Sequence, residues 1–454
     1  MIHKKKSAAA IGILLVAAAA AIFIFLKGTA GAGPAWAGTD GETRGSLRGD
    51  AESGVETSAL TAVIGGRVLT GTGLEIENGV VLIRDGKITA VGPAGSIAVP
   101  ESAHVIIAKG RVVTPGLIDS HSHLGLGPSG GITEDNETTD PVTPQLRIID
   151  SIHPEGLGPD RDQFKNALAE GVTAVAARPG SGNVIGGQSA VLKLRGGTVD
   201  DMVILFPADM KMALGRKGAY AAKGVMPTTK MGAAYLVRKA LVEAADYGFA
   251  LDRYEKEKAK DPKAVPPPRD LKKEAMLKVV RREIPVHIHV HTSDDIMTAV
   301  RLAEEFNFLR LSLGHAVEAY KVADELARSG VAVVVGPQMT TYDDEGRLIN
   351  LAGFLRDKGV HVDIMSDADV VQQSFLRYQA AVAVKYGMDP GEALKAITLN
   401  PARTMGLEGR IGSLEPGKDA DLAVFDGDPF DIMTRTVMVL VDGKVVYTAD
   451  KDGK

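Results

Sequence analysis

Histidines and an aspartate end four short apolar segments of this chain, and side chains of these types can together bind a metal ion. The segments are GLIDSHSH, PVHIHVH, LRLSLGH and VHVDIMSD, and the residues are His121, His123, His287, His289, His291, His315 and Asp367. Neutral imidazole and carboxylate groups are common ligands of zinc and related metals. A single histidine in such a place would more often be a structural residue. So many at the ends of apolar runs predict a metal site.

The pair His121 and His123 is the start of this predicted site. Residues at i and i+2 of a strand share a face, so both rings can point at one ion. The chain has no cysteine, which excludes disulfides, thiolate ligands and a cysteine nucleophile. The ligands must therefore be His, Asp, Glu or a modified Lys. The histidines that end no such segment are expected to be structural or exposed, and they are His3, His104, His153 and His361.

Composition narrows the class of protein. Apolar residues make up 45% and charged residues 24% of the 454 residues, as in globular proteins with a sizeable core. The formal net charge is −5, with no basic tract outside the N-terminus. Nucleic-acid binding needs clustered Lys and Arg to neutralise phosphates, so no nucleic-acid partner is expected.

The elements that must position these residues alternate between strands and helices over residues 116–404. Apolar runs such as VTAVAARP and VAVVVGP alternate with helical patterns such as DDIMTAVRLAEEF. This alternation predicts a TIM-like (β/α)8 barrel of the α/β class, whose functional residues lie at the C-terminal ends of the strands. An open doubly wound sheet is the alternative, but no phosphate-binding G-x-G-x-x-G loop that leads from a strand into a predicted helix supports it. The charged stretch 252–283 is expected to be a solvated insertion, a lid or plain surface.

Both ends of the folded region are rich in short β segments. Residues 59–115 and 405–451 contain apolar runs with Asp85-Gly86 and Asp442-Gly443 between them, and Asp-Gly is a strong hairpin signal. These two regions are expected to form one composite β-sandwich domain.

The N-terminal segment predicts export. Three lysines, Lys4 to Lys6, precede an uncharged run from Ser7 to Leu26 and an Ala35-Trp36-Ala37 cleavage-like pattern. Residues 1–37 are therefore expected to be a signal peptide or an uncleaved membrane anchor, and the polar residues 38–58 a flexible linker. Either interpretation places the folded part outside the cytoplasm, in the periplasm or the extracellular space.

Several motifs together resemble the amidohydrolase superfamily, in its imidazolonepropionase-like and metal-dependent dipeptidase-like branch. The resemblance covers about residues 59–450. Its marks include TPGLIDSHSH at 114–123, ADMKMALG at 208–215, PVHIHVHTSDDI at 285–296, LGHAVEAY at 313–320, SDAD at 366–369 and the segment from 397 to 429 that contains GSLEPGKDADLAVF. The first and last motifs are highly specific in combination.

The resemblance implies a ligand set for one or two divalent ions, with zinc expected. Its members are His121, His123, Lys211, His289, His315 and Asp367. His289 is chosen over its same-face neighbours His287 and His291 by the family pattern. Lys211 matches the carboxylated lysine that bridges two metals in binuclear members, with Lys193 as the alternative. A surface or substrate-binding role for Lys211 is the simpler interpretation.

The same resemblance implies hydrolysis of an amide-type C–N bond in a cyclic amide, an imide or a dipeptide-like small molecule. A metal-activated hydroxide would attack, and Asp367 would act as general base and then acid. His315 would stabilise the oxyanion. Deaminase and lactonase activities use the same ligand set, and a silent binding scaffold is a further alternative.

Some features depart from the family or stay open. SDAD replaces the T-D-x-N-P-G of imidazolonepropionase, which argues against that substrate. Four residues could reach a substrate: Arg178, Asn183, Gln188 and Tyr320. The substrate and the oligomeric state, including a homo-oligomer, are left open.

Overall fold

A computed structural model describes residues 60–127, 134–155, 162–368 and 370–449 of the chain. The predicted signal or anchor segment (1–37) and linker (38–58) lie outside the described residues. Among the described residues, no helix is both long and apolar enough to cross a membrane.

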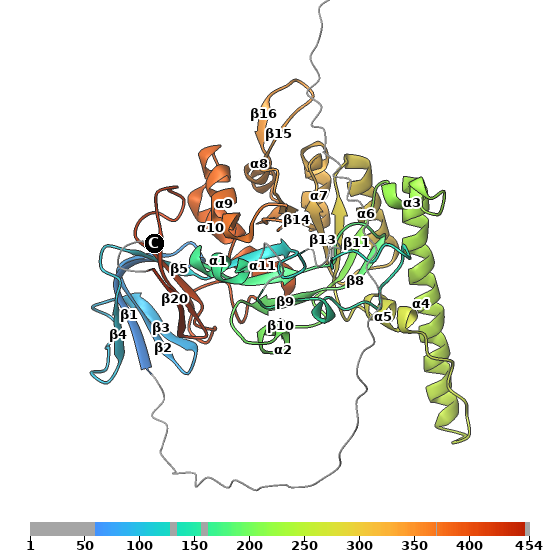
Figure 1. Ribbon diagram of the computed structural model, residues 1–454, viewed down its shortest axis with the longest axis horizontal. Coiled ribbons are helices and arrows are strands. Elements are labelled where there is room, and N and C mark those ends of the chain that lie inside the picture. The colour runs from blue at the N-terminus through green and yellow to red at the C-terminus, as the bar shows by residue number, and fades with distance from the viewer. Residues whose placement is uncertain (1–59, 128–133, 156–161, 369, 450–454) are drawn as a thin grey trace, which may run out of the picture. The chain divides into compact units, whose positions relative to one another are not determined.

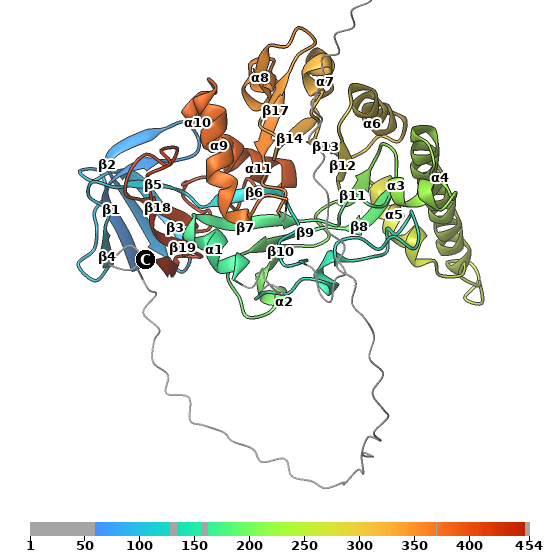
Figure 2. The ribbon, with the colours of Figure 1, turned by 45° about the horizontal axis from the view of Figure 1, so that its top comes forward.

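The two ends of the described chain pair in one eight-stranded sheet (Figures 1 and 2). Its strands are β1 (Leu60–Leu69), β2 (Glu75–Arg84), β3 (Lys87–Pro93), β4 (His104–Ile107), β5 (Val112–Pro115), β18 (Leu422–Phe425), β19 (Thr436–Val441) and β20 (Lys444–Thr448). The order is β20-β19-β18-β5-β1-β2-β3, and β4 pairs with β1. The expected sandwich is thus one continuous sheet by its hydrogen bonds, with a hydrophobic core of its own.

The predicted hairpins are present in this sheet. Asp85 and Gly86 join β2 to β3 and have φ values of 49° and 77°, while Asp442 and Gly443 join β19 to β20 with φ values of 49° and 69°. Positive φ at both central residues suits the twist of a two-residue hairpin.

The central strands form two open sheets. The strands are β6 (Leu117–Ser122), β7 (Val172–Ala177), β8 (Ile185–Gln188), β9 (Ala190–Lys193), β10 (Val203–Leu205), β11 (Met210–Ala213), β12 (Val286–Val290), β13 (Leu311–His315), β14 (Ala332–Val335) and β17 (His361–Ile364). One sheet has the order β10-β9-β7-β6 and the other β17-β14-β13-β12-β11-β8. A short hairpin of β15 (Thr340–Tyr342) and β16 (Leu348–Asn350) is separate.

The fold is therefore mixed α/β, as expected, but a closed barrel is not confirmed. The strands from β11 through β12, β13 and β14 to β17 are parallel neighbours. The ladder breaks at Ser189, because β8 pairs antiparallel with β11 and β9 pairs antiparallel with β7. No ladder joins β6 to β17 among the described residues.

Helices follow most of the central strands. They are α1 (Gln163–Ala169), α2 (Val199–Met202), α3 (Gly218–Ala222), α4 (Lys230–Lys258), α5 (Leu271–Val280), α6 (Ser293–Glu305), α7 (Ala323–Ser329), α8 (Leu351–Asp357), α9 (Leu376–Lys385), α10 (Pro390–Ala396) and α11 (Leu399–Met405), with short 3-10 turns η1 (Ile148–Asp150), η3 (Ala319–Val322) and η4 (Gln373–Phe375). Helix α6 shows why they pack: Ile296, Ala299 and Val300 recur at helical spacing and are buried.

The charged stretch 252–283 is more ordered than a solvated insertion. Its first residues continue α4, which begins at the N-cap Thr229, and its end forms α5, capped by Asp270. Helix α5 packs against α4 and buries Met276 and Val279. The end of α4 from residue 252 and the connection between the two helices are mostly exposed and match the expected solvated surface.

Candidate metal centre

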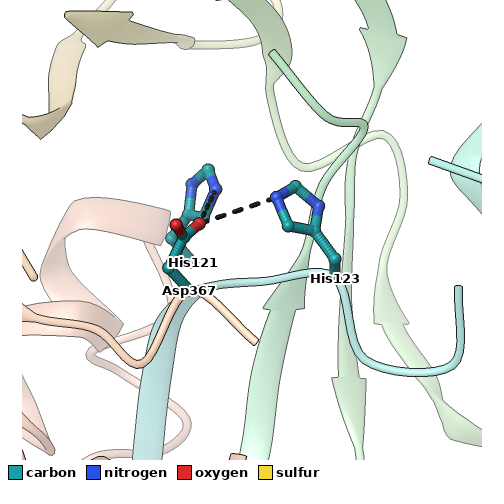
Figure 3. Close-up of side chains that lie close together, drawn as sticks. All are labelled: His121, His123 and Asp367. Carbon is teal, nitrogen blue, oxygen red and sulfur yellow. Dashed lines mark ion pairs between the residues drawn. The ribbon is translucent and has the colours of Figure 1, made fainter. Parts of the chain in front are cut away.

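Three of the predicted ligands converge at one point (Figure 3). His121 lies near the end of β6, His123 follows that strand, and Asp367 follows β17. One ligand atom from each lies within 4.8 Å of the others. The Asp367 Oδ1 atom is 3.2 Å from His121 Nε2 and 3.6 Å from His123 Nε2.

These distances fit a bound divalent metal. Ligand atoms about 2.0–2.2 Å from a tetrahedral ion lie roughly 3.3–3.6 Å from one another, and two imidazoles with one carboxylate are a donor set that zinc prefers. His121 is fully buried, and burial holds the pKa of its ring well below the usual value. The ring is therefore neutral, which is the form that binds a metal.

The carboxylate of Asp367 is ionised at neutral pH. Burial alone would raise its pKa, but the hydrogen bond with His123 and the interactions with nearby His315 and Lys211 outweigh burial and lower that pKa to about 2. Asp367 has a φ of 56° and His315 a φ of 64°. Such left-handed conformations cost about 1–3 kcal/mol for residues other than glycine and collect at functional sites.

Hydrogen bonds to the far side of each imidazole orient both histidines. His123 Nδ1 donates to the carbonyl of Arg178 at 2.7 Å, so Nε2 is the nitrogen that faces Asp367. His121 Nδ1 lies 3.0 Å from His287 Nε2. Metal-binding histidines characteristically have such a partner on the second nitrogen.

Lys211 lies beside this cluster, and Lys193 does not. Lys211 is on β11, is fully buried, and its Nζ is 3.3 Å from His121 Nε2. Burial, with the nearby charge of Arg178, lowers the pKa of Lys211 to about 7. Lys193 instead pairs with Asp419 at 2.7 Å and with Asp421 at 3.0 Å, at the terminal sheet. The alternative assignment to Lys193 is therefore wrong.

The side chains of His287 and His289 on β12, and of His291 just after this strand, differ in how deeply they are buried. His287 is fully buried, with Nδ1 2.8 Å from Ser312 Oγ, and it supports His121. The ring of His289 lies 4.3 Å from that of His315, whose Nε2 is 3.8 Å from Asp367 Oδ2. His291 is exposed. His289 and His315 thus border the three-ligand cluster rather than belonging to it.

A buried aspartate that the sequence analysis did not single out lies behind the ligands. Asp119 accepts hydrogen bonds from the backbone N–H of His121 at 3.0 Å and the backbone N–H of Ser366 at 3.0 Å. It also accepts one from Gln373 Nε2 at 2.6 Å. It therefore connects β6 to the segment that carries Asp367. Its position two residues before His121 is the sequence signal that could have identified it.

The suggested substrate contacts are used within the protein. Arg178 pairs with Asp209 at 2.6 Å, and Asn183 accepts a hydrogen bond from the Tyr220 hydroxyl at 2.7 Å. Gln188 accepts from Lys278 at 3.1 Å, and the Tyr320 hydroxyl donates to a backbone carbonyl at 3.4 Å. None of the four is shown to face a substrate.

A cavity of about 420 Å³ is lined by His289, the one predicted ligand among its lining residues. Its lining includes His289, His291, Lys217 and Thr292. Another cavity, of about 640 Å³, is lined by residues such as Gln145, Arg147 and Phe206 and by none of the predicted ligands. The smaller cavity is therefore the better candidate for the substrate site.

Comparison with known proteins decides the family. The sequence pattern of the Amidohydrolase family matches residues 112–453. The chain belongs to the amidohydrolase family. It is accordingly an enzyme of the class that hydrolyses carbon–nitrogen bonds.

Known relatives share this membership. An amidohydrolase structure from Thermotoga maritima MSB8 is similar at 36% identity and a TM-score of 0.77, over 86% of this chain and all of that one. The chain is 31% identical to the amidohydrolase tasK of Hapsidospora irregularis. The match covers 81% of this chain but only 40% of tasK. It is 25% identical to an imidazolonepropionase of Rhizobium rhizogenes, over 78% of this chain and 88% of the relative.

Proposed function

We propose that this amidohydrolase uses a divalent metal to hydrolyse an amide-type C–N bond of a cyclic amide, an imide or a dipeptide-like small molecule. Zinc is the metal we expect. The observation that carries the proposal is the convergence of His121, His123 and Asp367 within 4.8 Å. Such a metal would supply Lewis acidity, which polarises a carbonyl and lowers the pKa of water.

The chain's own residues then have distinct roles in the proposal. Asp367, ionised and beside His121, accepts the proton of the attacking water and delivers it to the leaving nitrogen. His315, 3.8 Å from the other oxygen of Asp367, serves as a ligand or stabilises the developing oxyanion. Burial lowers the pKa of His315 to about 4, so its ring is neutral at the working pH.

A second metal is part of the proposal, with carboxylated Lys211 as the bridge and His289 and His315 as further ligands. Carboxylation requires a neutral amine, and burial of Lys211 favours that form. The short separation of the His289 and His315 rings supports a shared ion at that end of the site.

We also propose that the two central sheets together make the (β/α)8 barrel of residues 116–404. Two contacts between the ends of β6 and β17 support closure: His123 N donates to Ala368 O at 2.6 Å, and Asp367 N donates to His121 O at 3.3 Å. On the other side, β8 and β9 are successive segments that pass from one sheet to the other.

A metal assay with a turnover panel tests this function. The purified protein is analysed for divalent metals and assayed on dipeptides, cyclic imides, amino-substituted heterocycles and lactones. Metal-dependent turnover of an amide or imide supports the proposal. Ammonia release alone would make the protein a deaminase, and turnover of lactones alone a lactonase. A metal-free protein with no turnover would be a binding scaffold.

A further inference from the structure

Lys217 is a buried cation at the cavity beside the metal centre. It follows β11 at the start of α3, is 6% exposed, and lines the cavity of about 420 Å³ together with His289 and His291. Burial is the main cause that lowers the pKa of both histidines, and the charge of Lys217 adds a smaller effect in the same direction. Its ammonium therefore lies close enough to act on a group bound in that cavity.

The described part of the protein gives this ammonium no directly paired carboxylate, and the charge of Asp295 acts on it only without a contact. Lys217 Nζ donates to the carbonyls of Ser181 at 2.9 Å and Leu214 at 3.3 Å. An ammonium has three donors, and the described residues offer no acceptor for the third. No carboxylate of the described chain forms an ion pair with Lys217. A buried charge without a partner is costly, because it loses its hydration without compensation.

The nearest candidate carboxylate, Asp295, is already engaged. It accepts a hydrogen bond from Thr292 Oγ1 at 2.8 Å and pairs with Lys230 Nζ at 2.9 Å. Arg216, exposed on the same cavity, also forms no ion pair among the described residues. The cavity wall at Arg216 and Lys217 is thus positive, and an anionic group of a ligand would complete it.

We propose that the substrate of this amidohydrolase carries a free carboxylate and that Lys217 binds this carboxylate while the scissile C–N bond lies at the metal centre. The inference rests on the proposed function, and it narrows the substrate to acidic amides such as N-acyl amino acids or dipeptides. The cavity volume is in the range typical of small-molecule sites. Lys217 is a specificity-determining residue in this account.

Binding of two matched probes tests the inference without turnover. N-acetylleucine and N-acetylleucinamide differ only in the carboxylate, and calorimetry on metal-free protein, which should turn over neither probe, gives both dissociation constants. A hydrogen bond to a charged group contributes about 1.5–3 kcal/mol, so wild type should prefer the acid by at least about tenfold. Lys217→Met should abolish that preference.

Two further variants separate charge from structure. Lys217→Gln keeps N–H donors for the carbonyls of Ser181 and Leu214 and removes only the charge, so it should also lose the preference. Lys223→Met removes an exposed lysine that lies outside the cavity lining. This control variant should keep the preference for the acid. An unchanged preference in both Lys217 variants would overturn the inference, as would equal binding of both probes by wild type.

The outcome also separates this inference from the proposed function. A protein that binds the acid through Lys217 but turns over nothing in the panel refutes hydrolysis and keeps the carboxylate site. Equal weakening of both probes in the Lys217 variants would show that Lys217 only supports the cavity wall, and would refute the inference.

Discussion

The Nδ1 atom of His121 lies 3.0 Å from the Nε2 atom of His287, and this contact determines which nitrogen of His121 faces Asp367. The contact continues to Ser312, so a chain of three buried side chains from β6, β12 and β13 holds the ring. The orientation of a predicted metal ligand therefore depends on a histidine outside the three-ligand cluster.

Removal of this support should weaken metal binding. His287→Leu fills much of the same space but cannot hydrogen-bond His121, and loss of such a partner typically costs about 10–100-fold in metal affinity. Titration of the apoprotein with zinc measures the effect. His291→Leu, on the exposed end of the same segment, is the matched control and should bind zinc as wild type does. Equal affinities in all three proteins would contradict the role of His287.

The two lysines that the sequence could not separate should respond oppositely to substitution. Lys211→Ala should lose at least one of two divalent ions per chain, because Lys211 lies beside His121. Lys193→Ala should keep its metal but lose about 3–5 kcal/mol of unfolding free energy, because it leaves the buried carboxylate of Asp421 without its ion-pair partner. Metal analysis with bicarbonate supplied, and denaturant unfolding, provide the two readouts. A wild-type content near one ion would count against the bridge.

The preference for acidic probes should depend on pH. Burial lowers the pKa of Lys217 to about 8, so the ammonium is present below that pH and is lost above it. The affinity for N-acetylleucine should therefore fall as pH rises through about 8, while that for N-acetylleucinamide stays level. His289 and His291 face the same cavity, but their pKa values lie lower still. Parallel pH profiles for the two probes would argue against Lys217 as the titrating group.

We propose that the folded part works outside the cytoplasm, as the first 37 residues predict. N-terminal sequencing of protein from native cells should give a start near Gly38. An intact Met1 on membrane-bound protein would instead favour the anchor. Recovery of full-length soluble protein from the cytoplasm would refute both interpretations.

The sequence predicted which residues at strand ends come together better than it predicted which other side chains lie around them. His121, His123 and Asp367 could be found because strand ends meet at one edge of an α/β sheet, so local pattern and chain order suffice. Lys211 and Lys193 both lie on short buried strands, and only the long-range pairing of Lys193 with Asp419 separates them.

The burial of each histidine and the continuity of the central sheet could not be predicted from local sequence pattern. His287, His289 and His291 share a face, and their different burial depends on neighbours from β6 and β13. The break at Ser189, where the chain passes from one sheet to the other, depends likewise on which strands lie beside it.

Substitution of Asp367 tests the central claim most directly. Asn keeps the size of Asp and one oxygen for a metal, but it cannot accept a proton at neutral pH. General acid–base catalysis contributes about 10²- to 10⁴-fold, so Asp367→Asn should lose at least about 10²-fold in kcat and change metal content and thermal unfolding much less. Asp389→Asn, which alters the N-cap of α10, is the control.

The measurement is kcat, metal content and unfolding temperature on one preparation of each variant. The account predicts a protein that is folded, metal-loaded and nearly inactive for Asp367→Asn, and nearly full activity for Asp389→Asn. Wild-type kcat in metal-loaded Asp367→Asn would contradict the assignment of Asp367 as the proton acceptor.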